Sequence, residues 1–322
     1  MKKGNIILVL LIMAAIGLGI FLLLQAKEKI SQRRPIRRPR VTEVPGQVPA
    51  GVGPTGVKST TGTAFAMAMI IRPDISRVCD YEMVALGGRN LKTKGDNPTF
   101  DPQFLDRAKS CGTKVMVALN DKTERILQDD GTGIDLDKFR EAVSFFKGKI
   151  DPYVNDGVVV VHGVIDEPHD CKNDWGGDCP SASEVDQASA ISKEYWPSLP
   201  TAVNTVPNYL ESEGYTWMNT DIIQFQYAYH KYQGDMKAFV DDAVALNNAG
   251  RFRQIAWSIQ AKSGGCETFQ GCPMTPDQIK NVSQTMCDAK EGKYLLFVHY
   301  DTTLLSPPGV SEALEFVKDV CS

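Results

Sequence analysis

Residues Val158–Asp170 read VVVVHGVIDEPHD. The largely apolar run Val158–Ile165 is rich in β-branched residues, which is typical of a strand buried on both faces. The run ends abruptly in two adjacent carboxylates, Asp166 and Glu167, and in Pro168, which stops the strand ladder and fixes the turn. Because neighbouring residues of a strand point to opposite sides, we expect only one of the two carboxylates to face a cavity.

This strand is one of eight short apolar runs that alternate with helical patterns. The predicted strands are Ala64–Ile71, Glu82–Leu86, Lys114–Leu119, Val158–Ile165, Ala202–Thr205, Ile222–Tyr227, Gln254–Ile259 and Tyr294–Val298. Strands that are buried on both faces and separated by helices form a parallel sheet. Eight of them within about 260 residues predict an α/β fold of the (β/α)8 type, the closed TIM barrel.

Helices are predicted where apolar residues recur at helical spacing between these strands. The predicted helices are Pro102–Ser110, Leu136–Lys149, Ala182–Tyr195, Met236–Ala249, Pro276–Ala289 and Val310–Val320. Ser181 and Thr275 directly precede two of them and are suited to act as N-caps. Only the short segment Arg72–Tyr81 joins the first two strands, so we do not expect a full first helix there.

The segment before the barrel has two parts. Residues 1–25 contain the uncharged run Ile6–Leu24, which is long enough to cross a bilayer as a helix, and no A-x-A cleavage site follows. Residues 1–25 are therefore predicted to be a transmembrane signal anchor. Residues 26–60 are rich in proline, glycine and arginine and predict a semi-extended linker, so the barrel domain would span 61–322.

Charge and cysteine content bear on partners and location. The net charge is −4 and no basic face is indicated, which argues against a nucleic-acid partner. The basic residues behind the anchor would favour a cytoplasmic barrel by the positive-inside tendency. All eight cysteines, however, follow the anchor, and two close pairs enclose polar loops, which is typical of disulfides in an oxidising compartment. We favour the cysteines and expect a single-pass protein of the cell membrane with an extracytoplasmic barrel.

The expected disulfides are Cys171–Cys179 and Cys266–Cys272, with the other four cysteines pairing among themselves. The alternatives are reduced cysteines in the cytosol or a zinc site, but the sequence has no CxxC motif. No metal and no cofactor are expected. Glu167 could share a cation with His169 and Asp170, but no third histidine converges in sequence.

In a (β/α)8 barrel the active site lies at the carboxyl ends of the strands. The strand ends here are rich in amides, carboxylates and aromatic rings, which suit a sugar because planar polar groups bind hydroxyls and rings pack on C–H faces. A phosphate ligand would need a glycine-rich nest near the last strands, which TTLLSPPG does not supply. The expected partner is therefore a carbohydrate, and the predicted substrate-binding residues are Arg89, Asn120, Asn204, Gln226, Tyr227, Tyr229, Trp257, Gln260 and His299.

The segment GVIDEPHD resembles the glycoside hydrolase barrels whose fourth strand ends in Asn-Glu-Pro, with Asp166 in place of Asn as in less characterised Asp-Glu-Pro barrels. The segments QYAY, residues 226–229, and WSIQ, residues 257–260, are similar to the sixth and seventh strands of those families. The resemblance implies that Glu167 is the general acid/base.

One position departs from this resemblance. A second Glu, the nucleophile, ends the seventh strand in the Asn-Glu-Pro enzymes, whereas this chain has Gln260, and an amide cannot form a glycosyl ester. The candidates for the second carboxyl are Asp166, Asp170, Asp121 and Asp301, of which we favour Asp301. An inverting pair or substrate assistance would fit this change better than a retaining mechanism.

Three functions follow as hypotheses. The first is a membrane-anchored, extracytoplasmic glycoside hydrolase-like protein that acts on a polysaccharide or cell-surface glycan. Its predicted catalytic residues are Glu167, Asp301 and Asp166. The second is a non-catalytic glycan-binding barrel that has lost the seventh-strand nucleophile. The third is a metal-dependent hydrolase. The sugar, its linkage and the oligomeric state stay open.

Overall fold

The computed structural model describes residues 64–69, 75–93, 99–120, 126–131, 133–232, 234–261, 264–267, 272–289, 291–299 and 309–321. The predicted anchor, residues 1–25, and the predicted linker, residues 26–60, lie outside these residues. Among the helices in the described ranges, none combines the length and the apolar character that a bilayer crossing requires.

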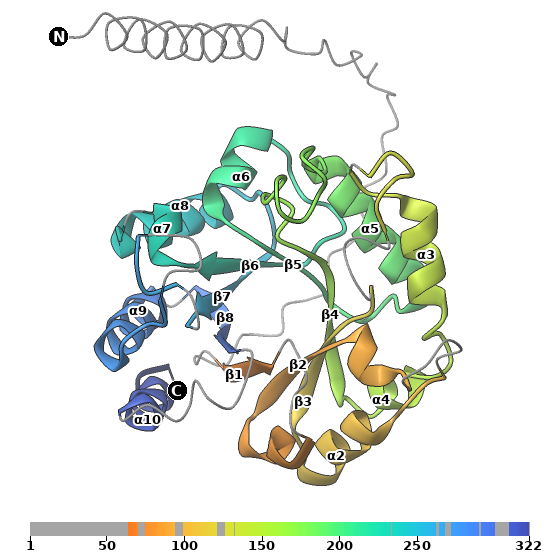
Figure 1. Ribbon diagram of the computed structural model, residues 1–322, viewed down its shortest axis with the longest axis horizontal. Helices are drawn as coiled ribbons and strands as arrows, with labels where there is room; N and C mark the ends of the chain where they lie inside the picture. Colours follow the sequence, from red (N-terminus) through yellow and green to blue (C-terminus); the bar gives the residue numbers. More distant parts are fainter. Residues whose placement is uncertain are drawn as a thin grey trace, which may run out of the picture. The chain divides into compact units, whose positions relative to one another are not determined.

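The strands form one parallel eight-stranded sheet around a common centre (Figure 1), in the order β1-β8-β7-β6-β5-β4-β3-β2. β1 and β2, the two ends of this order, also lie against each other. The described residues show no strand ladder between those two. The strands are β1 Ala64–Met69, β2 Met83–Gly87, β3 Lys114–Ala118, β4 Val159–Asp166, β5 Thr201–Thr205, β6 Ile222–Tyr227, β7 Gln254–Gln260 and β8 Gly292–His299. All eight predicted strands are confirmed, and the fold is a TIM-type barrel.

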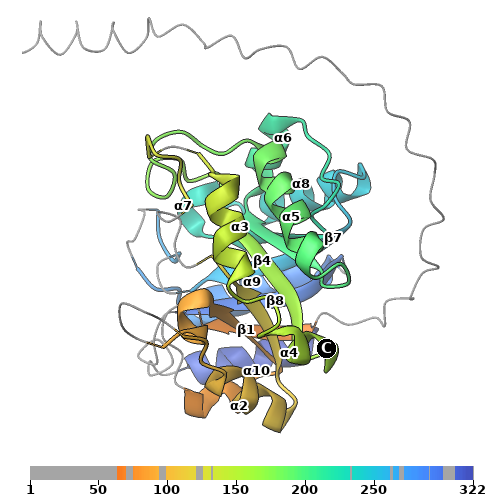
Figure 2. The same ribbon diagram turned by 90° about the vertical axis from the view of Figure 1, so that its right-hand side faces the viewer.

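Helices surround the sheet, and Figure 2 shows α3 and α5 over β4. Two segments are 3-10 helices, η1 Ile75–Asp80 and η2 Gly88–Leu91, so no full first helix forms, as expected. The α-helices are α2 Gln103–Cys111, α3 Leu136–Ser144, α4 Asp151–Asn155, α5 Ala182–Tyr195, α6 Pro207–Glu213, α7 Tyr229–Tyr232, α8 Met236–Asn248, α9 Pro276–Asp288 and α10 Val310–Cys321. Ser181 and Thr275 are N-caps in capping boxes, as predicted.

The buried side chains fall into two separate clusters. A small cluster comes from strands alone and marks the inside of the barrel: Met83, Ala85, Val161, Ala202, Ile222 and Ala256. The large cluster joins the other face of the strands to the surrounding helices, and it includes Val203, Phe225, Trp257 and Phe239. Membership of one cluster or the other therefore tells which way a strand residue points.

Three disulfides are described: Cys79–Cys111, Cys171–Cys179 and Cys266–Cys272. Cys287 is disulfide-bonded as well. Both predicted disulfides, Cys171–Cys179 and Cys266–Cys272, are thus confirmed. The first bridge joins η1 to α2 and anchors the segment that replaces the first helix.

Candidate active site

The end of β4 does not alternate regularly. The register of β4 against β5 shifts between Gly163 and Ile165, where one extra residue is accommodated. As a result both Val164 and Ile165 pack in the outer cluster, and Asp166 pairs with Asn204 of β5. Asn204 lies two residues beyond Ala202 of the inner cluster and shares its face. Asn204 Nδ2 donates to Asp166 Oδ1 at 2.6 Å, so Asp166 is turned toward the barrel mouth.

Glu167 follows with a backbone φ of 43°, the only left-handed non-glycine residue in the described part of the chain. Its backbone is fixed on both sides. Its N–H donates to the Asn204 carbonyl at 2.9 Å, and its own carbonyl accepts from Trp175 Nε1 at 3.0 Å and from the Asp170 N–H at 2.9 Å. The bulge and this conformation together break the alternation, so both carboxylates reach the mouth. The expectation that only one does is corrected for that reason.

The Glu167 carboxylate is held by a lysine from another element. Lys231 Nζ, on α7, donates to Glu167 Oε1 at 2.6 Å and to Gln226 Oε1 at 2.9 Å. The side chains of Lys231 and Glu167 are 13% and 21% exposed. His169 Nε2 lies 3.9 Å from the same Oε1, while His169 Nδ1 contacts Thr205 Oγ1 at 3.2 Å.

The surroundings change the proton affinity of three neighbours. Removal from bulk water and the adjacent Glu167 carboxylate raise the pKa of Asp166 to about 7, against the hydrogen bond from Asn204. The Asp166 residue is nevertheless exposed at the mouth, so the like charge of the adjacent Glu167 is the firmer cause of this upward direction. Burial and the Lys231 charge lower the pKa of His169 to about 3 and also lower that of His230. Both imidazoles are therefore neutral at neutral pH.

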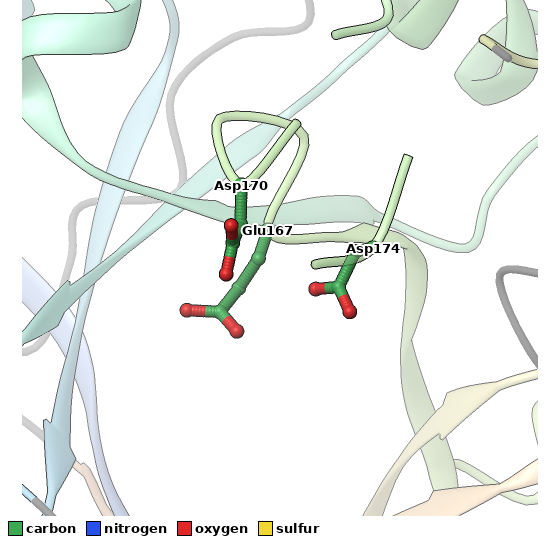
Figure 3. A group of neighbouring side chains, drawn as sticks. All are labelled: Glu167, Asp170 and Asp174. Carbon is green, nitrogen blue, oxygen red and sulfur yellow. The ribbon is translucent and has the colours of Figure 1, made fainter. Parts of the chain in front are cut away.

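Two more carboxylates lie beside Glu167. One oxygen each of Glu167, Asp170 and Asp174 lies within 4.8 Å of the others, and Figure 3 shows the three carboxylates gathered on one side of the loop after β4. Asn173 Nδ2 donates to both oxygens of Asp170, at 3.0 and 2.9 Å. Clusters of this kind offer oxygen ligands to a hard cation, but Lys231 already supplies a positive charge to Glu167. His169, considered above only as an alternative cation ligand beside Glu167, is not part of this cluster.

Several predicted binding residues gather at the carboxyl ends of β5 to β7. Asn204 and Gln260 are each 8% exposed, and Gln226 is 2% exposed. Asn204 Oδ1 and Gln260 Oε1 are buried without a hydrogen-bond partner among the described residues. Buried amide oxygens left in this state are costly and are available to a ligand. Asn120 is half-buried and lies two residues after the end of β3.

Three predicted aromatic residues do not face the mouth. Trp257 and Tyr227 are buried in the outer cluster, where both rings lie against Phe239. The reason is strand alternation, which directs Gln226 and Gln260 inward and their aromatic neighbours outward. Tyr229 and Tyr227 line a cavity of about 180 Å³ together with Met236 of α8, Met274 and several residues of α9.

Other predicted positions lie outside the description. Asp301 and Asp121 are outside the described residues, and the side chains of Arg89 and His299 are not described. Sequence reasoning missed Lys231 and Asp174. Lys231 lies on a four-residue helix that leaves no periodic pattern, and Asp174 is one of several polar residues in the stapled loop.

Comparisons with known proteins support the fold. No family matches the sequence and no curated protein matches it. A GH10 endoxylanase retrieved from a sugarcane soil metagenome is similar in structure over 80% of this chain and 97% of its own, with a TM-score of 0.51 and 10% identity. A beta-glucuronidase from an uncultured Clostridium species is similar over 81% of this chain, with a TM-score of 0.52 and 9% identity. The match spans half of the glucuronidase chain. At these identities the likeness shows the fold: the chain has a glycoside hydrolase-like TIM barrel.

Proposed function

We propose that this protein acts on a glycan at the carboxyl-terminal mouth of its barrel, with Glu167 as the central residue. One observation carries the proposal: a partly exposed Glu167 carboxylate stands at the end of β4, next to Asp166 and ion-paired to Lys231. Strand ends of this polarity are where barrel active sites lie. The inward amides of Asn204 and Gln260 supply the hydrogen-bonding groups that sugar hydroxyls need.

Hydrolysis of a glycosidic bond needs two carboxyl groups in different protonation states. Asp166 and Glu167 have different surroundings, because the pKa of Asp166 is raised and Glu167 is ion-paired to Lys231. An ion-paired carboxylate is suited to accept a proton, so in our proposal Glu167 acts first as the base. The carboxyl that donates a proton is Asp166 or Asp301.

The second candidate function is a glycan-binding barrel without turnover. It is favoured by Gln260, which ends β7 on the inner face and provides no carboxylate nucleophile, and whose carbonyl oxygen has no hydrogen-bond partner within the described ranges. Hydrolysis of any glycan by the wild-type protein would decide against this second candidate.

The test is a panel of polysaccharides and cell-surface glycans offered to the full chain, to Glu167→Gln and to Glu141→Gln. Glu141 is an exposed residue of α3 and serves as the matched control. We expect wild type and control to bind and hydrolyse the same glycan, and Glu167→Gln to lose about 100-fold or more in rate. Identical binding and turnover in wild type and Glu167→Gln would remove Glu167 from the proposal.

The cellular location belongs to the same proposal. We infer that the barrel works outside the cytoplasm, attached through residues 1–25, because stable loop-stapling disulfides form in oxidising compartments. Alkylation of unreduced protein in its native membrane, followed by mass spectrometry, tests this inference. Free thiols at Cys171, Cys179, Cys266 and Cys272 would contradict it.

A further inference from the structure

Lys231 has an environment that the proposed chemistry does not yet explain. It lies on α7, just after β6, and its side chain is only 13% exposed. Lysine is almost never this enclosed unless it is paired. Both acceptors of its ammonium group belong to the mouth, namely Glu167 Oε1 from the end of β4 and Gln226 Oε1 from β6.

The contacts of Glu167 are one-sided. Oε1 faces Lys231, and no hydrogen bond from the described residues engages Oε2. Asp170 and Asp174 repel the carboxylate from the loop side, since their oxygens lie within 4.8 Å. His169 is near Oε1 but neutral, so within the described ranges the attraction that offsets this repulsion comes from Lys231.

We propose that Lys231 is a positioning residue, which ties Oε1 of Glu167 to β6 and leaves Oε2 free to face the bound glycan. This inference rests on the proposed function, because it describes how Glu167 is presented to a sugar. The tether spans from β4 to β6 across β5, and Gln226 fixes its far end. Without it, the carboxylate would be pushed by Asp170 and Asp174 away from any defined position.

The same charge acts on Asp166. The groups that bear on its pKa are Glu167 and Asp174, which raise it, and Lys231 and Asn204, which lower it. Loss of the Lys231 charge therefore moves the titration of Asp166 to higher pH. A lysine that only fills space would not have this effect.

The experiment compares the full chain with Lys231→Met, Lys231→Gln and Lys231→Arg. Titration of the Asp carboxyl carbons is followed by NMR, with Asp166 assigned through Asp166→Asn. Lys231→Met should raise the Asp166 midpoint, and Lys231→Arg should leave it close to wild type. Lys231→Gln keeps a hydrogen-bond donor without the charge, and it carries the test if the methionine variant does not fold.

Lys193→Met is the matched control. Lys193 Nζ also contacts a carboxylate, Asp221 Oδ2, at 2.6 Å with 26% of its side chain exposed, but Asp221 precedes β6 at the opposite end of the barrel. We expect no change of the Asp166 midpoint in this variant. An equal midpoint in wild type, Lys231→Met and Lys231→Gln would overturn the inference.

Turnover gives the second readout. On a glycan that the wild type hydrolyses, Lys231→Met should lower kcat about tenfold or more with little change of KM, and Lys231→Arg should restore most of it. An unchanged kcat would overturn the positioning role. A wild type that neither binds nor hydrolyses any glycan, beside a shifted Asp166 midpoint, would refute the proposed function while supporting the electrostatic link from Lys231.

Discussion

Glu167 combines a reactive carboxylate with an unfavourable backbone conformation. A φ of 43° costs a non-glycine residue about 1–2 kcal/mol, and hydrogen bonds from Trp175, Asp170 and the Glu167 N–H hold it there. Such conformations persist where the surrounding structure over-determines them. The hydrogen bonds around Glu167 thus hold its carboxylate where the backbone alone would not place it.

This strain predicts an inverted ranking of small residues. Glu167→Gly should be more stable than Glu167→Ala by about 1 kcal/mol, because glycine adopts positive φ without a steric penalty. Both variants lose the Lys231 ion pair, so the comparison isolates the backbone. Chemical denaturation of the two variants measures the difference.

Glu141 on α3 provides the reference, since there the glycine variant should be less stable than the alanine variant by about 1 kcal/mol. If alanine is also the more stable residue at position 167, the backbone there carries no strain.

Sequence reasoning at this scale identified Glu167 and Asp166 but misjudged their orientation. Strict alternation allowed one inward carboxylate. Gly163 inside the strand was the available signal, since an isolated strand glycine often marks a bulge. The left-handed conformation of Glu167 had no such signal in the sequence. It depends on hydrogen bonds with Asn204 of β5 and with Trp175 of the loop after β4, and these partners are known only from the folded structure.

Among the elements, the loop after β4 is the most closely tied to the site. It carries Asp170 and Asp174, and its Cys171–Cys179 bridge closes around the fully buried Trp175. The Trp175 indole donates to the Glu167 carbonyl, so the loop supports the backbone of the residue it surrounds. The Cys171–Cys179 disulfide therefore stabilises the site as well as the fold.

Replacing Cys171 and Cys179 by serine should lower the free energy of unfolding by about 2.5 kcal/mol, the loop-closure value for a separation of 8 residues. It should also weaken glycan binding, because Asp174 and Trp175 lose their anchor. Thermal unfolding and glycan-binding titrations are the measurements. The Cys266–Cys272 pair, replaced in the same way, is the control and should affect stability more than binding.

Element prediction succeeded where a pattern was long enough to repeat. α5 and α9 carry capping boxes and several helical turns, and the predicted bounds agree with the structure to within one residue. α7 has four residues and was missed, and Lys231 was missed with it. Tyr227, Tyr229 and Trp257 were predicted to lie at the mouth because they belong to the segments QYAY and WSIQ. The alternation of side chains along β6 and β7 was not applied to them.

At the scale of the whole molecule, the barrel followed from eight buried strands and the helices between them. The sequence did not indicate that polar side chains would be fully buried in the wall of the barrel. His162 of β4 is fully buried between the sheet and its helices, with Nδ1 2.5 Å from Ser192 Oγ and its ring near Phe139 and Trp196. Burial lowers its pKa to about 3, so the folded protein holds it neutral.

This neutrality predicts acid sensitivity of the entire domain. Below about pH 6.5 the unfolded chain binds a proton at His162 and the folded chain does not, so stability is complete above that pH and falls as pH decreases toward 3. The slope from this residue is about 1.4 kcal/mol per pH unit. Denaturation series from pH 8 to pH 4 on wild type and His162→Gln measure it.

The substitution should flatten the pH dependence, and its cost at pH 8 reports packing alone. His169, whose pKa is lowered by burial and Lys231, contributes a second slope of the same sign that persists in the variant. Parallel curves for wild type and variant would mean that His162 takes up its proton in the folded state.

The bulge in β4 has a consequence for how such a site changes over time. A bulge is one inserted residue, and here it is the difference between Ile165 and Asp166 as the side chain turned inward. Removing Val164 would restore regular pairing and leave Ile165 opposite Val203 and Asp166 opposite Asn204, with Asp166 still turned inward. The mouth of this barrel can thus tolerate the loss of one codon in this strand, because pairing with the neighbouring strand, not residue count, decides which side chain turns inward.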